Sequence, residues 1–104
     1  MAKEINNKEF KELVLENKEE LVVVDFYANW CGPCRMLAPI ITEVCEQEGV
    51  KLYKVNTDEQ EDLAKQNGVL ALPTVMFFRN GEMLEKFVGF RPQEAIEELI
   101  KMYK

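Results

Sequence analysis

The sequence contains no histidine, and this absence removes several classes of enzyme from consideration. Ser-His-Asp hydrolases and Cys-His nucleophilic enzymes need an imidazole to take the proton from the nucleophile. A zinc site built from two cysteines and two histidines needs the same residue. Composition alone therefore excludes these mechanisms.

Long hydrophobic runs are also missing. No segment approaches the roughly 20 apolar residues that a membrane-spanning helix needs. The first ten residues contain four charged side chains and no apolar run, which argues against a signal-peptide core or an anchor. Linker-like stretches and internal repeats are absent as well. We therefore expect one domain spanning residues 1–104 that remains in the cytoplasm.

Positive charge and cysteine are both scarce. Lys and Arg number 13 against 19 Asp and Glu, which gives a formal net charge of -6. Such a balance argues against nucleic-acid and membrane partners, which attract positively charged surfaces. The three cysteines are odd in number and argue against a framework of structural disulfides. Hydrophobic residues make up 47% of the chain, so it is expected to form an ordinary globular core.

Strand-like and helix-like patterns alternate along the chain, as is typical of an α/β domain. The run from Leu21 to Tyr27 is almost continuously apolar, as in a strand buried on both faces. The segment from Cys34 to Glu48 is an amphipathic helix in which Pro39 should produce a kink. Asn80-Gly81 favours a type I′ hairpin turn. We expect strands at 2–5, 21–27, 50–56, 74–79 and 82–88, and helices at 7–16, 34–48, 61–66 and from 92 to the end.

The pair Cys31 and Cys34 lies between the buried strand and the following helix. A helix amino terminus has free N–H groups and a favourable dipole, which stabilise the thiolate that attacks disulfides. One helical turn also brings residues three apart to the Cα separation that a disulfide requires. The spacing therefore favours a pair that cycles between dithiol and disulfide. Cys31 precedes the helix and is expected to be the exposed thiol with the lower pKa, whereas Cys34 lies inside the first turn and is expected to be more buried.

The same spacing also occurs in half of a zinc site. Only Cys45 remains as a further thiol, so closing a zinc site would require a carboxylate or a second chain. No metal is therefore expected. Cys45 itself lies on the apolar face of the expected helix, where it is either a small buried hydrophobic residue or a regulatory thiol.

Residues 24–36 read VDFYANWCGPCRM, and Leu72-Pro73-Thr74, Asn80-Gly81 and Val88-Gly89 follow further along. Over nearly the whole chain this pattern resembles the thioredoxin family, whose active-site signature is highly specific. The resemblance implies a thioredoxin fold, with a central mixed sheet of four to five strands flanked by about four helices. It also implies a protein-disulfide reductase in which Cys31 attacks the client disulfide and Cys34 resolves the mixed disulfide.

The residues between the cysteines agree with a reductase. Gly32 and Pro33 bring no charge, whereas a histidine there would make the pair more oxidising. The chain has no dinucleotide-binding glycine motif, so the redox-active group is the Cys31–Cys34 disulfide and no cofactor is bound. By resemblance, the partners are disulfide-containing client proteins and a thioredoxin reductase that depends on NADPH or ferredoxin. We expect the chain to act as a monomer.

Asp25 is the one charged residue in the apolar strand before the cysteines. Burial should raise its pKa toward the range useful for proton transfer. By resemblance, Asp25 is the buried acid/base that helps to deprotonate Cys34, and Lys54 in the neighbouring strand moderates the pKa shift. The alternatives are a surface aspartate at a strand end and an exposed lysine.

A client-docking groove is also implied by the resemblance. A cis bond before Pro73 would place the Leu72 backbone opposite the cysteines, where it can pair with an extended client segment. Trp30 is expected on the rim, although core packing is the alternative. The expected groove residues are Trp30, Gly32, Pro33, Leu72, Pro73, Gly89 and Phe90.

Four features depart from the family pattern: Tyr27, Arg35, the segment Phe90-Arg91-Pro92, and Leu70-Ala71. None involves the sulfur chemistry, but Phe90 would change the shape of one groove wall and so the choice of partner. Two rival functions remain. The first rival is a binding or chaperone module with incidental cysteines, which the intact pair and Asp25 disfavour. The second is a disulfide oxidant or isomerase, which the Gly-Pro dipeptide disfavours.

Overall fold

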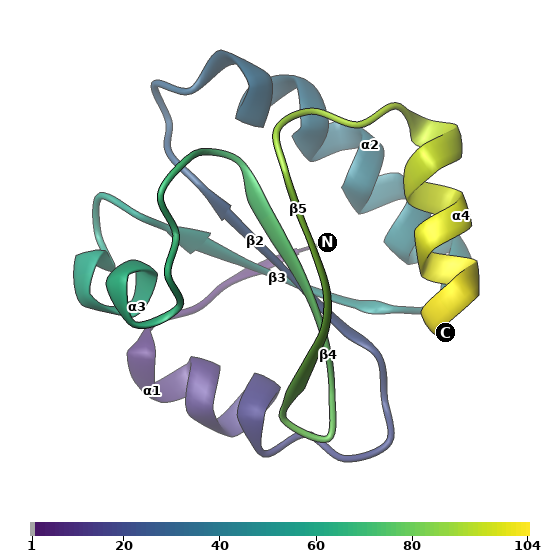
Figure 1. Ribbon diagram of the computed structural model, residues 1–104, viewed down its shortest axis with the longest axis horizontal. Coiled ribbons are helices and arrows are strands. Elements are labelled where there is room, and N and C mark those ends of the chain that lie inside the picture. The colour runs from purple at the N-terminus through teal and green to yellow at the C-terminus, as the bar shows by residue number, and fades with distance from the viewer. Residues whose placement is uncertain (1) are drawn as a thin grey trace.

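The computed structural model describes residues 2–104 and is built on a five-stranded mixed sheet with the order β1-β3-β2-β4-β5 (Figure 1). The strands are β1 (Lys3–Glu4), β2 (Val22–Tyr27), β3 (Lys51–Asn56), β4 (Thr74–Arg79) and β5 (Glu82–Val88). The helices are α1 (Asn7–Phe10), its π-helical continuation η1 (Lys11–Leu15), α2 (Gly32–Glu48), α3 (Glu61–Gln66) and α4 (Gln93–Tyr103). The α/β class and the mixed sheet predicted from the sequence are therefore confirmed.

The strand pairing follows from the connections between the strands. β2 runs parallel to β3 because α2 crosses over between them, as the alternation of patterns predicts. β4 is antiparallel to β2, and β5 returns beside β4 through the short turn at Asn80-Gly81. The carboxyl end of β2, the start of α2 and the start of β4 thus lie at one edge of the sheet.

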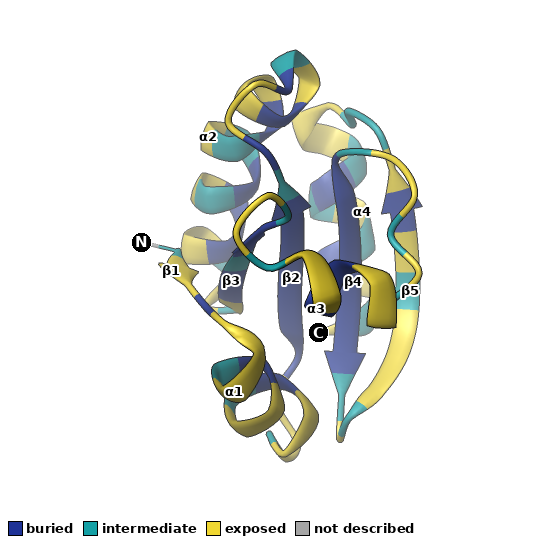
Figure 2. Cartoon of the chain, turned by 90° about the vertical axis from the view of Figure 1, so that its left-hand side faces the viewer, coloured by how far each residue is buried: buried dark blue, intermediate teal, exposed yellow. Residues whose placement is uncertain are grey.

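Two hydrophobic layers cover the central strands. On one face, residues of α2 and α4 pack against alternate residues of β2 and β4. On the other face, α1, η1 and α3 pack against the intervening residues. β2 is buried along both faces, as its continuous apolar run predicts, while β5 is an exposed edge strand (Figure 2).

The first helix agrees with the predicted range but changes its hydrogen-bonding pattern halfway. The Asn6 side chain accepts a hydrogen bond from the Glu9 N–H at 2.9 Å, and Glu9 accepts one from the Asn6 N–H at 3.1 Å, which completes a capping box. From Lys11 the segment is π-helical, and the Glu16 N–H bonds to the Lys11 carbonyl. A periodicity argument identifies the helix but does not distinguish these two patterns.

The hairpin turn adopts the conformation that its sequence predicts. Asn80 has φ 54° and Gly81 has φ 77°, and both angles are in the left-handed region. Gly81 also packs against the end of η1, because a Cβ atom at this position would lie 2.6 Å from the Leu15 carbonyl oxygen. The turn therefore requires glycine for both conformation and space.

Gly81→Ala is expected to lower the free energy of unfolding by about 1–3 kcal/mol more than the matched change Gly68→Ala. Gly68 has a similar φ of 68°, but a Cβ there would meet no described atom within 4 Å. Both variants therefore carry the cost of a left-handed alanine, about 1–2 kcal/mol, and only Gly81→Ala adds a backbone clash. Urea unfolding of both variants measures the difference, and equal losses would contradict the close packing of the turn on η1.

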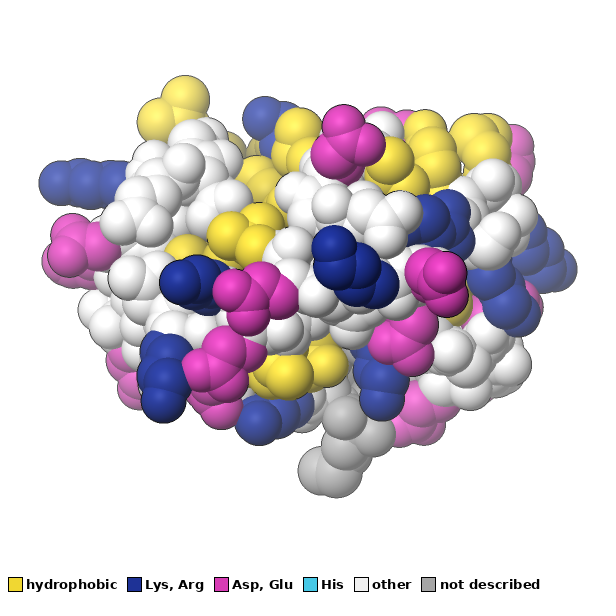
Figure 3. Space-filling model, turned by 90° about the horizontal axis from the view of Figure 1, so that it is seen from below, with side chains coloured by type: hydrophobic (Ala, Val, Ile, Leu, Met, Phe, Trp, Pro, Cys, Tyr) yellow, Lys and Arg dark blue, Asp and Glu magenta, His cyan; other side chains and the backbone are white. Residues whose placement is uncertain are grey.

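Within residues 2–104, no helix has the length and apolar character needed to cross a membrane. On the face seen in Figure 3, Lys and Arg side chains lie intermixed with Asp and Glu side chains. A duplex or anionic lipid surface is bound by basic side chains gathered together. This face does not provide such a surface.

Candidate active site

The cysteines lie where the chain leaves β2 and enters α2. The helix begins at Gly32, two residues earlier than its apolar periodicity predicts, because Cys31 acts as the N-cap. The Cys31 sulfur accepts a hydrogen bond from the Cys34 backbone N–H at 3.2 Å. Pro33 lies in the first turn, where its missing N–H costs nothing. The helix amino terminus therefore directs an N–H group at the Cys31 sulfur.

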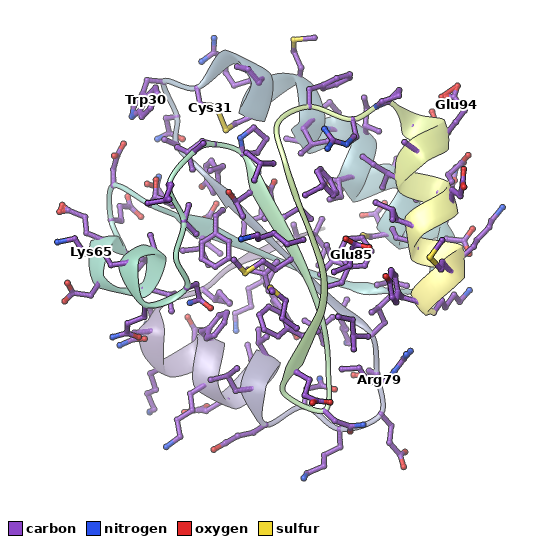
Figure 4. The ribbon with its side chains drawn as sticks, in the orientation of Figure 1. Trp30, Cys31, Lys65, Arg79, Glu85 and Glu94 are labelled. Atoms are coloured by element: carbon purple, nitrogen blue, oxygen red, sulfur yellow. A yellow bond between two sulfur atoms is a disulfide. The ribbon has the colours of Figure 1, made fainter. Side chains whose placement is uncertain are left out.

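Cys31 and Cys34 are joined by a disulfide with a Cα–Cα distance of 5.2 Å. This distance lies in the range expected for residues one helical turn apart. The pair lies at the end of the molecule marked by Cys31 and Trp30 in Figure 4. The spacing argument for a disulfide is therefore confirmed.

The prediction that Cys31 is the exposed thiol is wrong for this disulfide form. Its exposed fraction is 5%, compared with 3% for Cys34. Both cysteines belong to one buried cluster with Ala28, and the half-buried side chains of Tyr27 and Leu72 pack against it. Exposure therefore does not distinguish the two cysteines. They differ in position, because Cys31 is the N-cap of α2 and Cys34 lies in its first turn.

The loop before β4 lies against the disulfide. The Leu72–Pro73 peptide bond is cis, as the resemblance implies, and Leu72 packs on the cysteine cluster. The Gly89 N–H donates a hydrogen bond to the Pro73 carbonyl at 2.8 Å, so the end of β5 is joined to this loop. Phe90 is half-buried and packs against the core under α2 and α4. Of the expected groove residues, Leu72 is thus brought to the cysteines, whereas Phe90 packs partly on the core.

Asp25 is completely buried, with an exposed fraction of 0%. Neither of its carboxylate oxygens has a hydrogen-bond partner among the described residues. Burial raises its pKa from 3.8 to about 6, and the positive charge of Lys54, its register neighbour in β3, opposes this rise. The burial and the direction of the pKa shift agree with the sequence prediction, and the surface alternative is wrong.

Lys54 contacts an aromatic side chain. Its ammonium nitrogen lies 4.3 Å from the centre of the Tyr27 ring, which is a cation–π geometry. The Tyr27 hydroxyl donates a hydrogen bond to the Glu4 carboxylate. Burial and this bond raise the pKa of Tyr27 well above its ordinary value, so the phenol stays protonated. Sequence reasoning treated Tyr27 only as a departure from the family and missed Glu4.

Trp30 is 69% exposed, so its alternative placement in the core is wrong. Its indole nitrogen donates a hydrogen bond to Asp58 at 3.0 Å. The Asn56 side chain accepts hydrogen bonds from the backbone N–H groups of Asp58 and Glu59 and so fixes this turn after β3. Sequence reasoning missed Asp58, because no local pattern links it to a tryptophan 28 residues away.

A cavity of about 150 Å³ adjoins Cys34. Its walls include Cys34, Lys54 and Tyr27. The volume is sufficient for water. The cavity therefore has room for a water molecule beside Cys34 and Lys54.

Cys45 lies in α2 and is free and buried. Burial, with a smaller contribution from Asp25, raises the pKa of its thiol to about 12. Such a thiol is not ionised at neutral pH and does not attack disulfides. The interpretation of Cys45 as a small buried hydrophobic residue is therefore favoured over a regulatory thiol.

Comparison with known proteins agrees with this geometry. The family model for thioredoxin matches residues 1–102. The chain belongs to the thioredoxin family. It is 40% identical to the thioredoxin of Listeria monocytogenes over 99% of each chain. It is 42% identical to the chloroplastic M-type thioredoxin of Spinacia oleracea, over 98% of this chain and 57% of that protein.

The likeness extends to solved structures. The thioredoxin of Plasmodium falciparum matches with a TM-score of 0.89 at 30% identity, covering 99% of this chain and 100% of that one. Membership of the thioredoxin family, together with the Cys31–Cys34 disulfide at a helix amino terminus, makes this protein a thiol-disulfide oxidoreductase. It acts as a protein-disulfide reductase through its dithiol-disulfide cycle.

Proposed function

We propose that the two cysteines of this thioredoxin-family protein have fixed roles, with Cys31 as attacking thiol and Cys34 as resolving thiol. The observation that supports this order is the hydrogen bond from the Cys34 N–H to the Cys31 sulfur. A sulfur at the N-cap is stabilised as a thiolate by such N–H groups and by the helix dipole. Cys34 lies within the first turn and lacks this position.

The exchange proceeds in two balanced steps. The Cys31 thiolate attacks one sulfur of a client disulfide, forms the mixed disulfide and displaces the second client sulfur as a thiolate, which takes a proton from solvent. Cys34 then loses its proton and attacks the Cys31 sulfur, which releases the first client sulfur as a thiolate. Two electrons pass to the client, whose disulfide becomes two thiols, while the protein becomes the Cys31–Cys34 disulfide.

Asp25 accepts the proton from Cys34 in the second step under this proposal. A carboxyl with a pKa of about 6 is ionised at neutral pH yet basic enough to take part in proton transfer. Lys54 holds that pKa within the useful range by opposing the effect of burial. The cavity lined by Cys34 and Lys54 is large enough for a water molecule beside the Cys34 thiol, and such a water can take part in moving its proton.

Client docking is proposed on the surface around the disulfide. The rim consists of Trp30, Gly32, Pro33, Leu72, Pro73, Gly89 and Phe90. An extended client segment would hydrogen-bond to the Leu72 backbone as an added strand. The exposed indole of Trp30, held by Asp58, provides a flat contact surface of the kind enriched at interfaces.

Trp30→Ala is expected to raise KM for a protein client by about tenfold, since a tryptophan that a docked client covers contributes about 1 kcal/mol or more to binding. The reaction with a small aromatic disulfide should change much less, because it makes few contacts with the rim. Steady-state turnover with both substrates measures the ratio. Met102→Ala on α4 is the matched control, because Met102 is similarly exposed at 62%. An equal KM change in the two variants would contradict the docking role of Trp30.

The remaining parts of the proposal concern partners and location. A separate thioredoxin reductase returns the Cys31–Cys34 disulfide to the dithiol and takes its electrons from NADPH or ferredoxin. The protein acts as a monomer in the cytoplasm and binds no cofactor, because the disulfide itself carries the electrons. Client turnover measured with each purified reductase in turn distinguishes the two electron sources.

A further inference from the structure

Three ionisable side chains lie in one row across neighbouring strands. Glu4 of β1 is the register partner of Lys54 of β3, and Lys54 is the register partner of Asp25 of β2. Side chains of paired residues in parallel strands project to the same face of the sheet. The positive charge of Lys54 therefore lies between two carboxyl groups, one exposed and one buried.

Tyr27 contacts two members of this row, one through its ring and the other through its hydroxyl group. It follows Asp25 by two residues in β2, so it projects to the same face. Its ring face lies under the Lys54 ammonium nitrogen, 4.3 Å from the ring centre. Its hydroxyl donates a hydrogen bond to Glu4. Tyr27 thus contacts both the cation and the outer carboxylate.

We propose that Glu4 and Tyr27 are positioning residues for disulfide exchange: Tyr27 holds Lys54 over its ring beside Asp25, and Glu4 fixes that ring by accepting its hydrogen bond. Glu4 also competes with Asp25 for the positive charge of Lys54. The pair therefore determines how strongly Lys54 acts on the buried carboxyl. This inference rests on the proposed acid/base role of Asp25.

The charges around Asp25 support this arrangement. Lys54 lowers the pKa of Asp25, and Glu4 raises it. From α2, Cys45 faces the carboxyl as a neutral thiol, and the two active-site cysteines form an uncharged disulfide. From β4, the register partner of Asp25 is the apolar Val75. The negative charge of Glu59, in the turn after β3, contributes to raising the pKa of Tyr27.

Glu4→Gln is expected to lower the titration midpoint of the Asp25 carboxyl. The amide keeps an oxygen that can accept the Tyr27 hydrogen bond, but it removes a negative charge near Asp25 and leaves Lys54 to act on Asp25 alone. The midpoint is read from the carboxyl carbon chemical shift in the disulfide form. Glu94→Gln, an exposed change at the far start of α4, is the control for net charge (Figure 4).

The contribution of Tyr27 is tested by a double-mutant cycle. In a Tyr27→Phe background the ring remains but no longer anchors Glu4, so the shift caused by Glu4→Gln should fall to half or less. A shift no larger than that of Glu94→Gln would overturn the role of Glu4. A shift of undiminished size in the Tyr27→Phe background would overturn the role of the hydroxyl.

The titration reports the charge on Asp25 whether or not this residue takes part in the reaction. If the midpoints move as expected while the reduction rate is insensitive to them, the positioning inference stands and the acid/base role of Asp25 fails. If the rate depends on Asp25 but the midpoints do not move, the positioning inference fails alone.

Discussion

Cys34→Ser is expected to turn the protein into a covalent trap for its clients. Cys31 still attacks a client disulfide, but the second thiol that resolves the mixed disulfide is missing. Cys45 does not replace it, because this thiol is buried and its pKa is raised to about 12. Covalent complexes with client proteins should therefore accumulate at least tenfold above those of the unchanged protein, which releases its clients.

The measurement is non-reducing electrophoresis after incubation of the reduced variant with oxidised client proteins, scoring adducts that collapse when reductant is added. Cys31→Ser is the matched control and should trap almost nothing. The combined change Cys34→Ser and Cys45→Ala should trap as well as Cys34→Ser alone. Equal trapping by the two single serine variants would contradict the distinction between attacking and resolving thiol, and stronger trapping by Cys31→Ser would invert it. No trapping by either variant would favour the binding-module alternative.

This prediction depends on helix position rather than on exposure. The sequence suggested that Cys31 would be the more accessible thiol, but packing of Ala28, Tyr27 and Leu72 buries both cysteines in the disulfide form. What distinguishes them is the N-cap geometry at Cys31, with the Cys34 N–H aimed at its sulfur. The asymmetry of the reaction is thus a consequence of where α2 begins.

Much of the fold could be predicted because its signals are local. The apolar run of β2, the periodicity of α2 and the turn at Asn80-Gly81 each specify one element through residues close in sequence. The end of α2 at Glu48 agrees with the prediction, but its start was less predictable, since apolar periodicity does not detect an N-cap cysteine. The π-helical segment η1 was not predictable for a similar reason, because its apolar residues suit both helix types.

The site was predictable where residues are close in sequence or match the family signature. Asp25, Cys31 and Cys34 lie within ten residues of one another. The burial of Asp25 follows from its place in an apolar strand, and the proximity of the two cysteines follows from the helical turn that joins them. Asp58 and Glu4 were missed because their contacts with Trp30 and Tyr27 depend on strand register and on the turn after β3. Only the assembled sheet brings these residues together.

Asp25→Asn is expected to slow the resolving step of disulfide reduction by about 10- to 100-fold at pH 7, because the amide does not accept the Cys34 proton. The unchanged protein should resolve the mixed disulfide no faster than the variant once the pH falls below about 6, where Asp25 becomes protonated. The rate of mixed-disulfide resolution is measured by rapid quench from pH 5 to pH 9. Equal rates for both proteins across this range would rule out the acid/base role.

The same substitution should change stability in a pH-dependent way. The pKa of Asp25 is raised in the folded state from 3.8 to about 6, so the folded state holds its proton over a range in which the unfolded state has released it. Stability therefore falls as the pH rises from about 4 to above 6, where the full cost of a buried charge is present. The asparagine variant avoids this cost but carries a constant one for its buried amide.

The pH dependence separates these two costs. Between pH 4 and pH 7, the free energy of unfolding of Asp25→Asn should increase relative to the unchanged protein by about 2–3 kcal/mol, since each unit of pKa difference corresponds to about 1.4 kcal/mol. The constant cost of the amide cancels in this comparison. Guanidinium unfolding of the disulfide forms at the two pH values measures it. A stability difference that does not change with pH would mean that Asp25 titrates alike in the folded and unfolded chains, and the buried carboxyl would then lose its place as the proton acceptor for Cys34.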